Sequence, residues 1–319
     1  MNLEPSPRDD RPAGNPAPAR RSRALVLSGG GALGALQAGF LHALFRTSYR
    51  PSMIIGTSAG ALNGAFLSFF PDADGTEKLA EIWKSLRNKR LFLFNPARVA
   101  YQVVSRQLCL ANSRLLQELV ERHAPEDDFA ATKVPLYITT TNLTQGCKSV
   151  FHDGPVSRAV LASTALPGIF CPVEIGGDLY VDGGVLANLD LDTAVELGAS
   201  EILAVDLSRC IEGTRPSDIP SLWSQTLDIV QRERVERDVE RLASRARITV
   251  VQPGVESPVS LGNLAAVDRL LEEGERLGED VLSSYVDDNG AFRAGTIHAP
   301  LHIHPFAESV TREPEPLSR

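Results

Sequence analysis

The sequence predicts an α/β protein in which a mainly parallel central sheet is flanked by helices. Short apolar runs that suit buried strands alternate with longer helical patterns over residues 23–286. Examples of such runs are residues 24–27 (ALVL), 53–55 (MII) and 201–205 (EILAV). This alternation is typical of βαβ units, whose strands pair in parallel. Because no linker interrupts the pattern, we expect a single domain over residues 23–286.

The remaining elements are assigned from residue type and spacing. Stretches rich in β-branched and aromatic residues predict strands, and apolar residues three or four positions apart predict helices. Two prolines mark an ordered loop over residues 166–172. Further strands are expected at 137–143, 149–151, 178–181 and 248–251, the last being the final core strand. Helices are expected at 36–44, 59–69, 76–87, 113–123, 156–163, 190–197, 219–246 and 264–282.

The two ends of the chain differ from this domain. Residues 1–22 are rich in Pro, Arg, Asp and Ala, so we expect a disordered tail. Residues 287–319 are expected to form a partly irregular C-terminal extension. The net charge of −8 argues against binding to nucleic acid. No apolar run approaches the roughly 18 residues of a membrane-spanning helix.

These features predict a cytoplasmic protein, with peripheral contact to a membrane left open. The first residues lack the basic-then-apolar pattern of a signal peptide. The cysteines are scattered without metal-like pairing, which favours reduced thiols and gives no reason to expect a metal or another cofactor. They are Cys109, Cys147, Cys171 and Cys210.

The stretch after the second strand has the pattern of a nucleophile elbow. Residues 54–60 read IIGTSAG, an apolar strand followed by Gly-x-Ser-x-Gly and a helix. A serine on such a turn points its hydroxyl out of the sheet, and Gly56 and Gly60 remove side chains that would clash there. An ordinary glycine-rich turn is the alternative reading of the pentapeptide alone. Ser58 is therefore the candidate nucleophile.

A glycine loop follows the first strand. Residues 29–34 (GGGALG) match the G-x-G-x-x-G pattern of a dinucleotide site, which also needs an acidic residue at the end of the second strand. The chain has Gly56, Thr57 and Ser58 at that position instead. Backbone N–H groups of a loop beside a serine elbow can stabilise an oxyanion. The candidate donors are the amides of Gly29, Gly30, Gly31 and Ala32.

Two kinds of base are open for Ser58. Asp182 ends a strand-like run, and Gly183 and Gly184 allow close approach of the backbone there, although a plain turn would look the same. Three late histidines occupy the chain-order position of a hydrolase-triad histidine. A histidine base would make activity fall through about pH 6 to 7, whereas an ordinary carboxylate would not. The late histidines are His298, His302 and His304.

Together these motifs resemble those of bacterial patatin-like phospholipases. The glycine loop, the elbow, the segment 162–170 (ASTALPGIF) and the Asp-Gly-Gly run at 182–184 follow family order between about residues 23 and 207. The resemblance implies a three-layer patatin-like fold and hydrolysis of lipid acyl esters by a Ser–Asp dyad without histidine. It implies that Ser58 is the nucleophile, that Asp182 is the base and that the glycine loop forms the oxyanion hole.

Two positions depart from the family pattern. Family members often carry an arginine where this chain has Leu33, and many carry a proline where it has Asp190. The first change leaves headgroup preference open but does not affect backbone donors. The resemblance implies a lipid or small acyl-ester substrate and leaves the acceptor and the oligomeric state open. A Ser-His-acid esterase and a catalytically silent lipid-binding protein remain as alternatives.

Overall fold

The computed structural model describes residues 22–87, 114–123, 126–208, 215–216, 219–253, 259, 262–286, 291–298 and 302–304. Within this part of the chain, strands and helices alternate as the sequence predicts. The tail expected at residues 1–22 lies outside the described residues except for Ser22. The domain limits at residues 23–286 stay a prediction.

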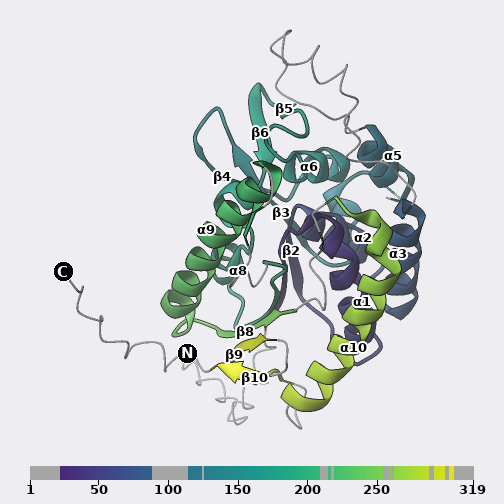
Figure 1. The fold of residues 1–319 in the computed structure, drawn as a ribbon, viewed down its shortest axis with the longest axis vertical. Helices are drawn as coiled ribbons and strands as arrows, with labels where there is room; N and C mark the ends of the chain where they lie inside the picture. Colours follow the sequence, from purple (N-terminus) through teal and green to yellow (C-terminus); the bar gives the residue numbers. More distant parts are fainter. Residues whose placement is uncertain are drawn as a thin grey trace, which may run out of the picture.

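One mixed sheet forms the centre of the molecule (Figure 1). Its strands are β1 Arg23–Leu27, β2 Met53–Thr57, β3 Leu136–Asn142, β4 Cys147–Phe151, β5 Val173–Ile175, β6 Asp178–Asp182, β7 Glu201–Val205, β8 Arg247–Gln252, β9 Gly295–His298 and β10 His302–His304. They lie in the order β10-β9-β8-β7-β1-β2-β3-β6-β5, with β4 also paired to β3. The stretch from β9 to β3 is parallel, whereas β10, β4, β6 and β5 are antiparallel to their neighbours. The fold class is therefore α/β, as predicted.

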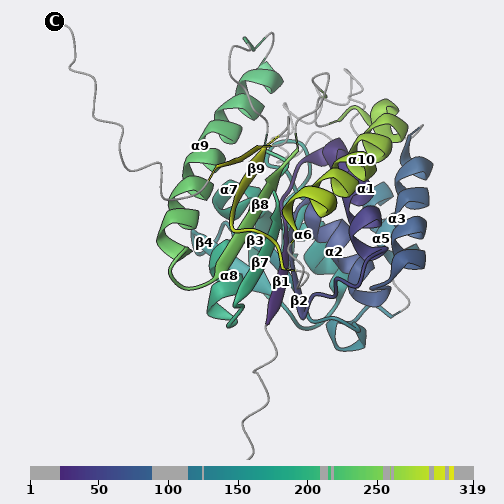
Figure 2. The same cartoon turned by 90° about the horizontal axis from the view of Figure 1, so that it is seen from below.

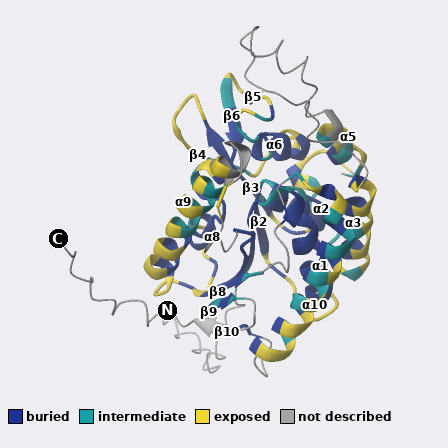
Figure 3. Ribbon diagram, viewed as in Figure 1, coloured by how far each residue is buried: buried dark blue, intermediate teal, exposed yellow. Residues whose placement is uncertain are grey.

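Helices cover both faces of the sheet, which gives three layers (Figures 1 and 2). They are α1 Gly34–Phe45, α2 Ala59–Phe69, α3 Ala73–Leu86, α5 Arg114–His123, α6 Val156–Ser163, α7 Gly184–Ala187, α8 Leu191–Glu196, α9 Ile219–Leu242 and α10 Val267–Tyr285. Helices α1, α2, α3 and α10 lie on one face, and α8 and α9 lie on the other. Figure 3 shows buried residues concentrated in the sheet and on the inward sides of these helices.

The packing of strand β1 on both of its faces shows why the sequences of the central strands are continuously apolar. Its residues Ala24 and Val26 pack into the cluster beneath α8 and α9, whereas Leu25 and Leu27 pack into the cluster beneath α1, α2, α3 and α10. All four side chains are fully buried. A parallel strand covered on both faces needs apolar residues at every position, not at alternate ones.

The C-terminal part of the sheet differs from the prediction. Strand β8 is not the final core strand, because β9 pairs with it in parallel and aligns Ile297 with Val251. Strand β10 then returns antiparallel to β9. The run that forms β9 reads GTIH, which has neither the length nor the alternation that identifies a strand. Pairing with β8, rather than local sequence, makes this segment extended.

Two further findings concern the predicted state of the cysteines and the search for a membrane-spanning helix. Cys171 is in a disulfide, so the expectation of reduced thiols is wrong at this position, whereas Cys147 is a free and exposed thiol. Cys109 and Cys210 lie outside the described residues. Within the described ranges, no helix combines the length and apolar character needed to cross a bilayer.

Candidate active site

Ser58 lies on the turn between β2 and α2, in a backbone conformation that few side chains adopt. Its φ is 54° and its ψ is −120°, and it is the one non-glycine residue with positive φ among the described residues. Conformations of this kind cost energy and persist where the surroundings enforce them. A Cβ at Gly60 would lie 2.2 Å from Leu27 O, and one at Gly56 would lie 2.5 Å from Gly60 O. Both glycines are therefore required by the close packing of this turn.

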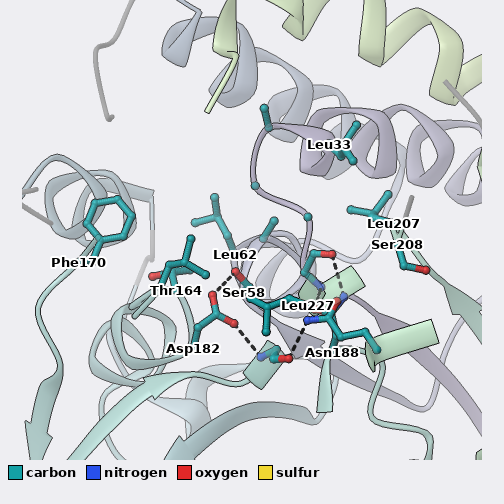
Figure 4. Close-up of a pocket in the computed structure, with 18 of the residues that line it drawn as sticks. Leu33, Ser58, Leu62, Thr164, Phe170, Asp182, Asn188, Leu207, Ser208 and Leu227 are labelled. Atoms are coloured by element: carbon teal, nitrogen blue, oxygen red, sulfur yellow. Dashed lines mark hydrogen bonds between the residues drawn. The ribbon is translucent and has the colours of Figure 1, made fainter. Parts of the chain in front are cut away.

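The register of three strands brings Asp182 to Ser58. Thr57 at the end of β2 pairs with Thr139 of β3, and the next residue, Thr140, pairs with Asp182 of β6. Ser58 Oγ donates a hydrogen bond to Asp182 Oδ2 at 2.6 Å (Figure 4). The structure thus brings together two residues that are 124 positions apart in the sequence.

Asp182 is 3% exposed, and its surroundings change its acidity. Burial raises the pKa of this carboxyl from 3.8 to about 6, although hydrogen bonds from Ser58 and from the Gly184 amide act in the lowering direction. The carboxylate is therefore a stronger base than an ordinary aspartate and is still mostly ionised at neutral pH. With this pKa, a carboxylate base at position 182 would leave a limb near pH 6, unlike the ordinary aspartate considered from the sequence.

The late histidines lie far along the sheet from Ser58. His298 is on β9 and is separated from β2 by β8, β7 and β1. At about 4.8 Å per strand, this places β9 roughly 19 Å from β2. His302 and His304 are on β10, one strand further away. A hydrogen bond to Ser58 requires about 3 Å, so the fold does not bring the two together.

The backbone amides of the glycine loop, which faces Ser58 and Asp182, differ in whether they already donate a hydrogen bond within the protein. The Gly29 amide donates to Asn188 Oδ1 at 3.0 Å, so Gly29 is excluded from the predicted set of oxyanion donors in this arrangement. The amides of Gly30, Gly31 and Ala32 donate to no acceptor among the described residues. Gly31 has a φ of 55°, which favours glycine. These three amides are the groups available to a developing oxyanion.

Asn188 fixes the glycine loop relative to Asp182, and the sequence alone did not reveal this. Its Oδ1 accepts the Gly29 amide, and its Nδ2 donates to Gly29 O at 3.3 Å. Because Asn188 and Asp182 belong to one short segment, this pair of bonds sets the position of the loop relative to the carboxylate. The family pattern drew attention only to the missing proline at Asp190, two residues further on.

Ser163 supports the strained turn from α6. Its Oγ accepts the Ser58 amide at 2.8 Å and donates to Thr139 O at 2.7 Å. Ser163 lies in the segment 162–170 that resembles the family, but no role could be assigned to it from the sequence. Because its hydroxyl accepts from Ser58 and donates to β3, it holds the backbone of Ser58 against β3.

The structure shows the surroundings of the two residues that depart from the family pattern. Asp190 caps α8 by accepting the Thr193 amide at 3.2 Å, and it forms an ion pair with Lys148 at 2.8 Å. It also accepts the Thr139 hydroxyl at 2.9 Å, so its carboxylate binds three neighbouring segments. Leu33 is 4% exposed and lines the pocket above Ser58 while packing into the core.

Replacing Asn188 by alanine tests its positioning role. Asn188→Ala leaves both polar groups of Gly29 without their partner in a buried site, so the loop loses its fixed distance to Asp182. We expect kcat to fall roughly 10- to 100-fold, the size of a misplaced oxyanion donor, with KM changed less than threefold. Steady-state kinetics on a soluble ester measure this effect. An unchanged kcat in a folded variant would contradict the positioning role of Asn188.

Known proteins resemble this chain over the region that carries the site. The sequence profile described as "Patatin-like phospholipase" matches residues 25–195. Patatin-like phospholipase domain-containing protein 6 of Homo sapiens is 32% identical over 188 residues, which are 58% of this chain and 13% of that protein. Lysophospholipase NTE1 of Mycosarcoma maydis is 30% identical over 200 residues, which are 60% of this chain and 10% of that protein. This chain therefore spans only a small part of the length of these relatives.

The profile, the fold and the site define the class of this protein. A mixed α/β sheet with parallel central strands carries a serine elbow after β2, a glycine loop after β1 and a buried aspartate at the end of β6. The chain belongs to the patatin-like phospholipase family, since the family profile covers more than half of its 319 residues. Among solved structures, VipD from Legionella pneumophila superposes with a TM-score of 0.43 and 12% identity, over 82% of this chain and 67% of that one.

Proposed function

We propose that this protein hydrolyses acyl esters of lipids, with Ser58 as the nucleophile and Asp182 as the base. The contact that carries the proposal is the 2.6 Å hydrogen bond from Ser58 Oγ to Asp182 Oδ2. It lies in a mainly apolar pocket that is also lined by Gly30 and Gly31. Membership of the family and the phospholipase names of its relatives support a lipid substrate.

The acylation step uses groups that already lie in contact. Asp182 accepts the proton of Ser58 as Oγ attacks the ester carbonyl, and the amides of Gly30, Gly31 and Ala32 stabilise the resulting oxyanion. Collapse of the tetrahedral intermediate breaks the bond to the alcohol, which takes the proton from Asp182 and leaves an acyl-serine. This step requires no metal ion or organic cofactor.

Deacylation repeats the step with water as the nucleophile. Asp182 now accepts a proton from water, and the tetrahedral intermediate collapses to a free fatty acid while Ser58 regains its proton. The Gly184 amide, which donates to Asp182 Oδ1 at 2.8 Å, keeps Oδ2 directed at the reacting group. We further propose that the protein acts in the cytoplasm and contacts membranes peripherally to reach its lipid.

A substrate panel tests this function. Purified protein is expected to release acid from p-nitrophenyl butyrate and from lysophosphatidylcholine or phosphatidylcholine vesicles. Pretreatment with a fluorophosphonate is the matched control and should abolish release, because the inhibitor traps the acylation step. Binding to the vesicles without turnover on any ester would contradict the proposal and favour a silent lipid-binding protein.

A further inference from the structure

The exposed side of α9 changes in character along the length of the helix (Figure 3). Among its described side chains, the exposed ones in the first half of the helix carry no charge. Three of these are large and apolar: Leu222 is 54% exposed, Ile229 45% and Val230 56%. In the second half, every exposed side chain is charged; these residues are Glu233, Glu236, Arg237, Glu240 and Arg241.

The three apolar residues lie on one face of the helix. Ile229 and Val230 follow Leu222 by seven and eight positions, which corresponds to two helical turns. Glu233, three positions after Val230, continues the same face with a charge. A helix at the surface of a globular protein normally directs polar residues outward. The segment defined by Leu222, Ile229 and Val230, which we call the apolar face of α9, departs from this rule.

The apolar face belongs to the same segment of α9 that forms one wall of the active-site pocket. Leu227 and Asp228, which lie between Leu222 and Ile229 in the sequence, line this pocket (Figure 4 shows Leu227). Gln231 Nε2 donates to Gly184 O at 2.8 Å and so holds α9 against α7. Val185, the next residue of α7, also lines the pocket and is itself exposed. Apolar surface therefore continues from α9 to the pocket.

A lipid bilayer matches this surface in position and in charge. A lipid ester in a membrane has to enter the pocket from the bilayer, so contact with lipid is needed beside the pocket. The charges that follow the apolar face are of both signs, as in the ion pair between Arg237 and Glu233 at 4.0 Å. Mixed charges suit zwitterionic headgroups, whereas a net charge of −8 gives no attraction to an anionic surface.

We propose that the apolar face of α9 docks on a bilayer of zwitterionic lipids and thereby holds the active-site pocket at the membrane surface. This proposal rests on the proposed function, since it takes the pocket as the site that receives a lipid ester. Interfacial helices bury an apolar face about 5–10 Å deep. Leu222 and Val230 are about 12 Å apart along the helix at about 1.5 Å per residue, so all three side chains reach the lipid while Glu233 stays among the headgroups.

Flotation of the whole chain with phosphatidylcholine vesicles measures the docking. We expect the wild-type protein to bind, with little effect of salt because apolar contact dominates. The double variant Ile229→Glu/Val230→Glu should bind at least about tenfold more weakly, because its carboxylates oppose transfer out of water. Vesicle binding by the double variant at the wild-type level would overturn the proposal.

Leu197→Glu is the matched control for this variant. Leu197 is 38% exposed and precedes β7, whereas Ser58 follows β2. Both strands run parallel to β1, so Leu197 lies at the opposite edge of the sheet from the active site. Leu197→Glu introduces the same charge on the same kind of residue and should bind vesicles as the wild type does. An equal loss of binding in Leu197→Glu would show a general effect of charge and contradict a specific face.

A fluorescent probe gives a second measurement that does not depend on a loss of binding. Bimane is attached to Ile229→Cys or to Leu197→Cys, in a Cys147→Ser background that removes an exposed free thiol. On addition of phosphatidylcholine vesicles, the emission of the probe at position 229 should shift to shorter wavelength, and that at position 197 should not. An unshifted probe at position 229 would also overturn the docking.

Kinetics on two forms of substrate connect the docking to hydrolysis. The ratio of the rate on phosphatidylcholine vesicles to the rate on soluble p-nitrophenyl butyrate should fall at least about tenfold in the double variant and stay at the wild-type value in Leu197→Glu. Weaker vesicle binding by the double variant, with no ester hydrolysed by the wild type, would uphold the docking and end the proposed function. Ester hydrolysis with equal vesicle binding by both proteins would uphold the function and end the docking.

A second copy of this chain is the other candidate to cover the apolar face. Sedimentation equilibrium without vesicles separates the two occupants. We expect the wild type and the double variant to have the same mass in solution. A wild-type dimer that becomes a monomer in the double variant, with vesicle binding unchanged, would assign the face to self-association and overturn the proposal.

Discussion

The Ser58→Ala protein is expected to lose at least about 10³-fold of kcat on p-nitrophenyl butyrate, because removing a catalytic nucleophile costs this much or more in serine hydrolases. The loss should appear equally on lipid esters, since acylation is the shared step. Initial rates of acid release, with the uncatalysed rate subtracted, give the measurement. Residual activity above one-hundredth of wild type would contradict the assignment of Ser58.

A second Ser–Asp pair supplies the control for this variant. Ser208 also lines the pocket, and its Oγ donates to the buried Asp206 at 2.7 Å, which resembles the contact made by Ser58. The acceptor is only two residues away, so this contact is a local turn and not a pairing set by strand register. Ser208→Ala should keep kcat within about fivefold. Folding of Ser58→Ala should be unchanged, because alanine removes no apolar contact.

Asp182→Asn is expected to lower kcat about 10³-fold or more, since removing a base that acts together with a nucleophile abolishes nearly the whole step. The amide keeps the shape, its oxygen can still accept the Gly184 hydrogen bond, and only the capacity to take a proton is lost. Alanine variants of the late histidines should keep most of their activity. A folded, active Asp182→Asn protein with an essential late histidine would overturn the proposed mechanism.

The same variant should not be less stable at neutral pH. Because the pKa of Asp182 is raised from 3.8 to about 6 in the folded protein, the folded state holds a proton between these pH values that the unfolded state has released. Wild-type stability therefore falls as pH rises from about 4 to 6, by up to about 3 kcal/mol from this group. Urea unfolding should show a shallower fall in Asp182→Asn over this range, and an identical fall in both proteins would contradict the raised pKa.

Activity should fall as pH drops below about 6, the pKa of Asp182, because the protonated carboxyl cannot act as a base. The pH at which activity falls does not by itself distinguish a carboxylate base from a histidine base, because the ordinary pKa of histidine is about 6.5. The substitutions at Asp182 and at the late histidines are therefore needed to identify the base. This conclusion depends on the burial of Asp182, which the sequence does not reveal.

Strong local signals in the sequence predicted most of the fold. Buried parallel strands such as β1 and β7 form continuous apolar runs, and α6 begins and ends where its pattern predicts. Strand β9 was missed because four residues of mixed character become extended only through pairing with β8. The disulfide at Cys171 was missed because isolated cysteines carry no pairing signal.

The residues of the candidate site could likewise be predicted only in part. Ser58, Asp182 and the glycine loop lie in motifs whose chemistry requires each residue type. They could therefore be identified from the sequence. The roles of Asn188 and Ser163 depend on distances between segments that are far apart in the chain, such as the 159 positions between Gly29 and Asn188. Spacing within one motif carries no information about such contacts.

Covalent labelling tests the central proposal most directly. A fluorophosphonate added to the wild-type protein, followed by proteolysis and mass spectrometry, should modify Ser58 and no other residue. Labelling should be at least about 10²-fold slower in Asp182→Asn, because the base is missing, and unchanged in Ser208→Ala and His298→Ala. An adduct on another residue, or undiminished labelling of the Ser58→Ala protein, would contradict the Ser58–Asp182 dyad.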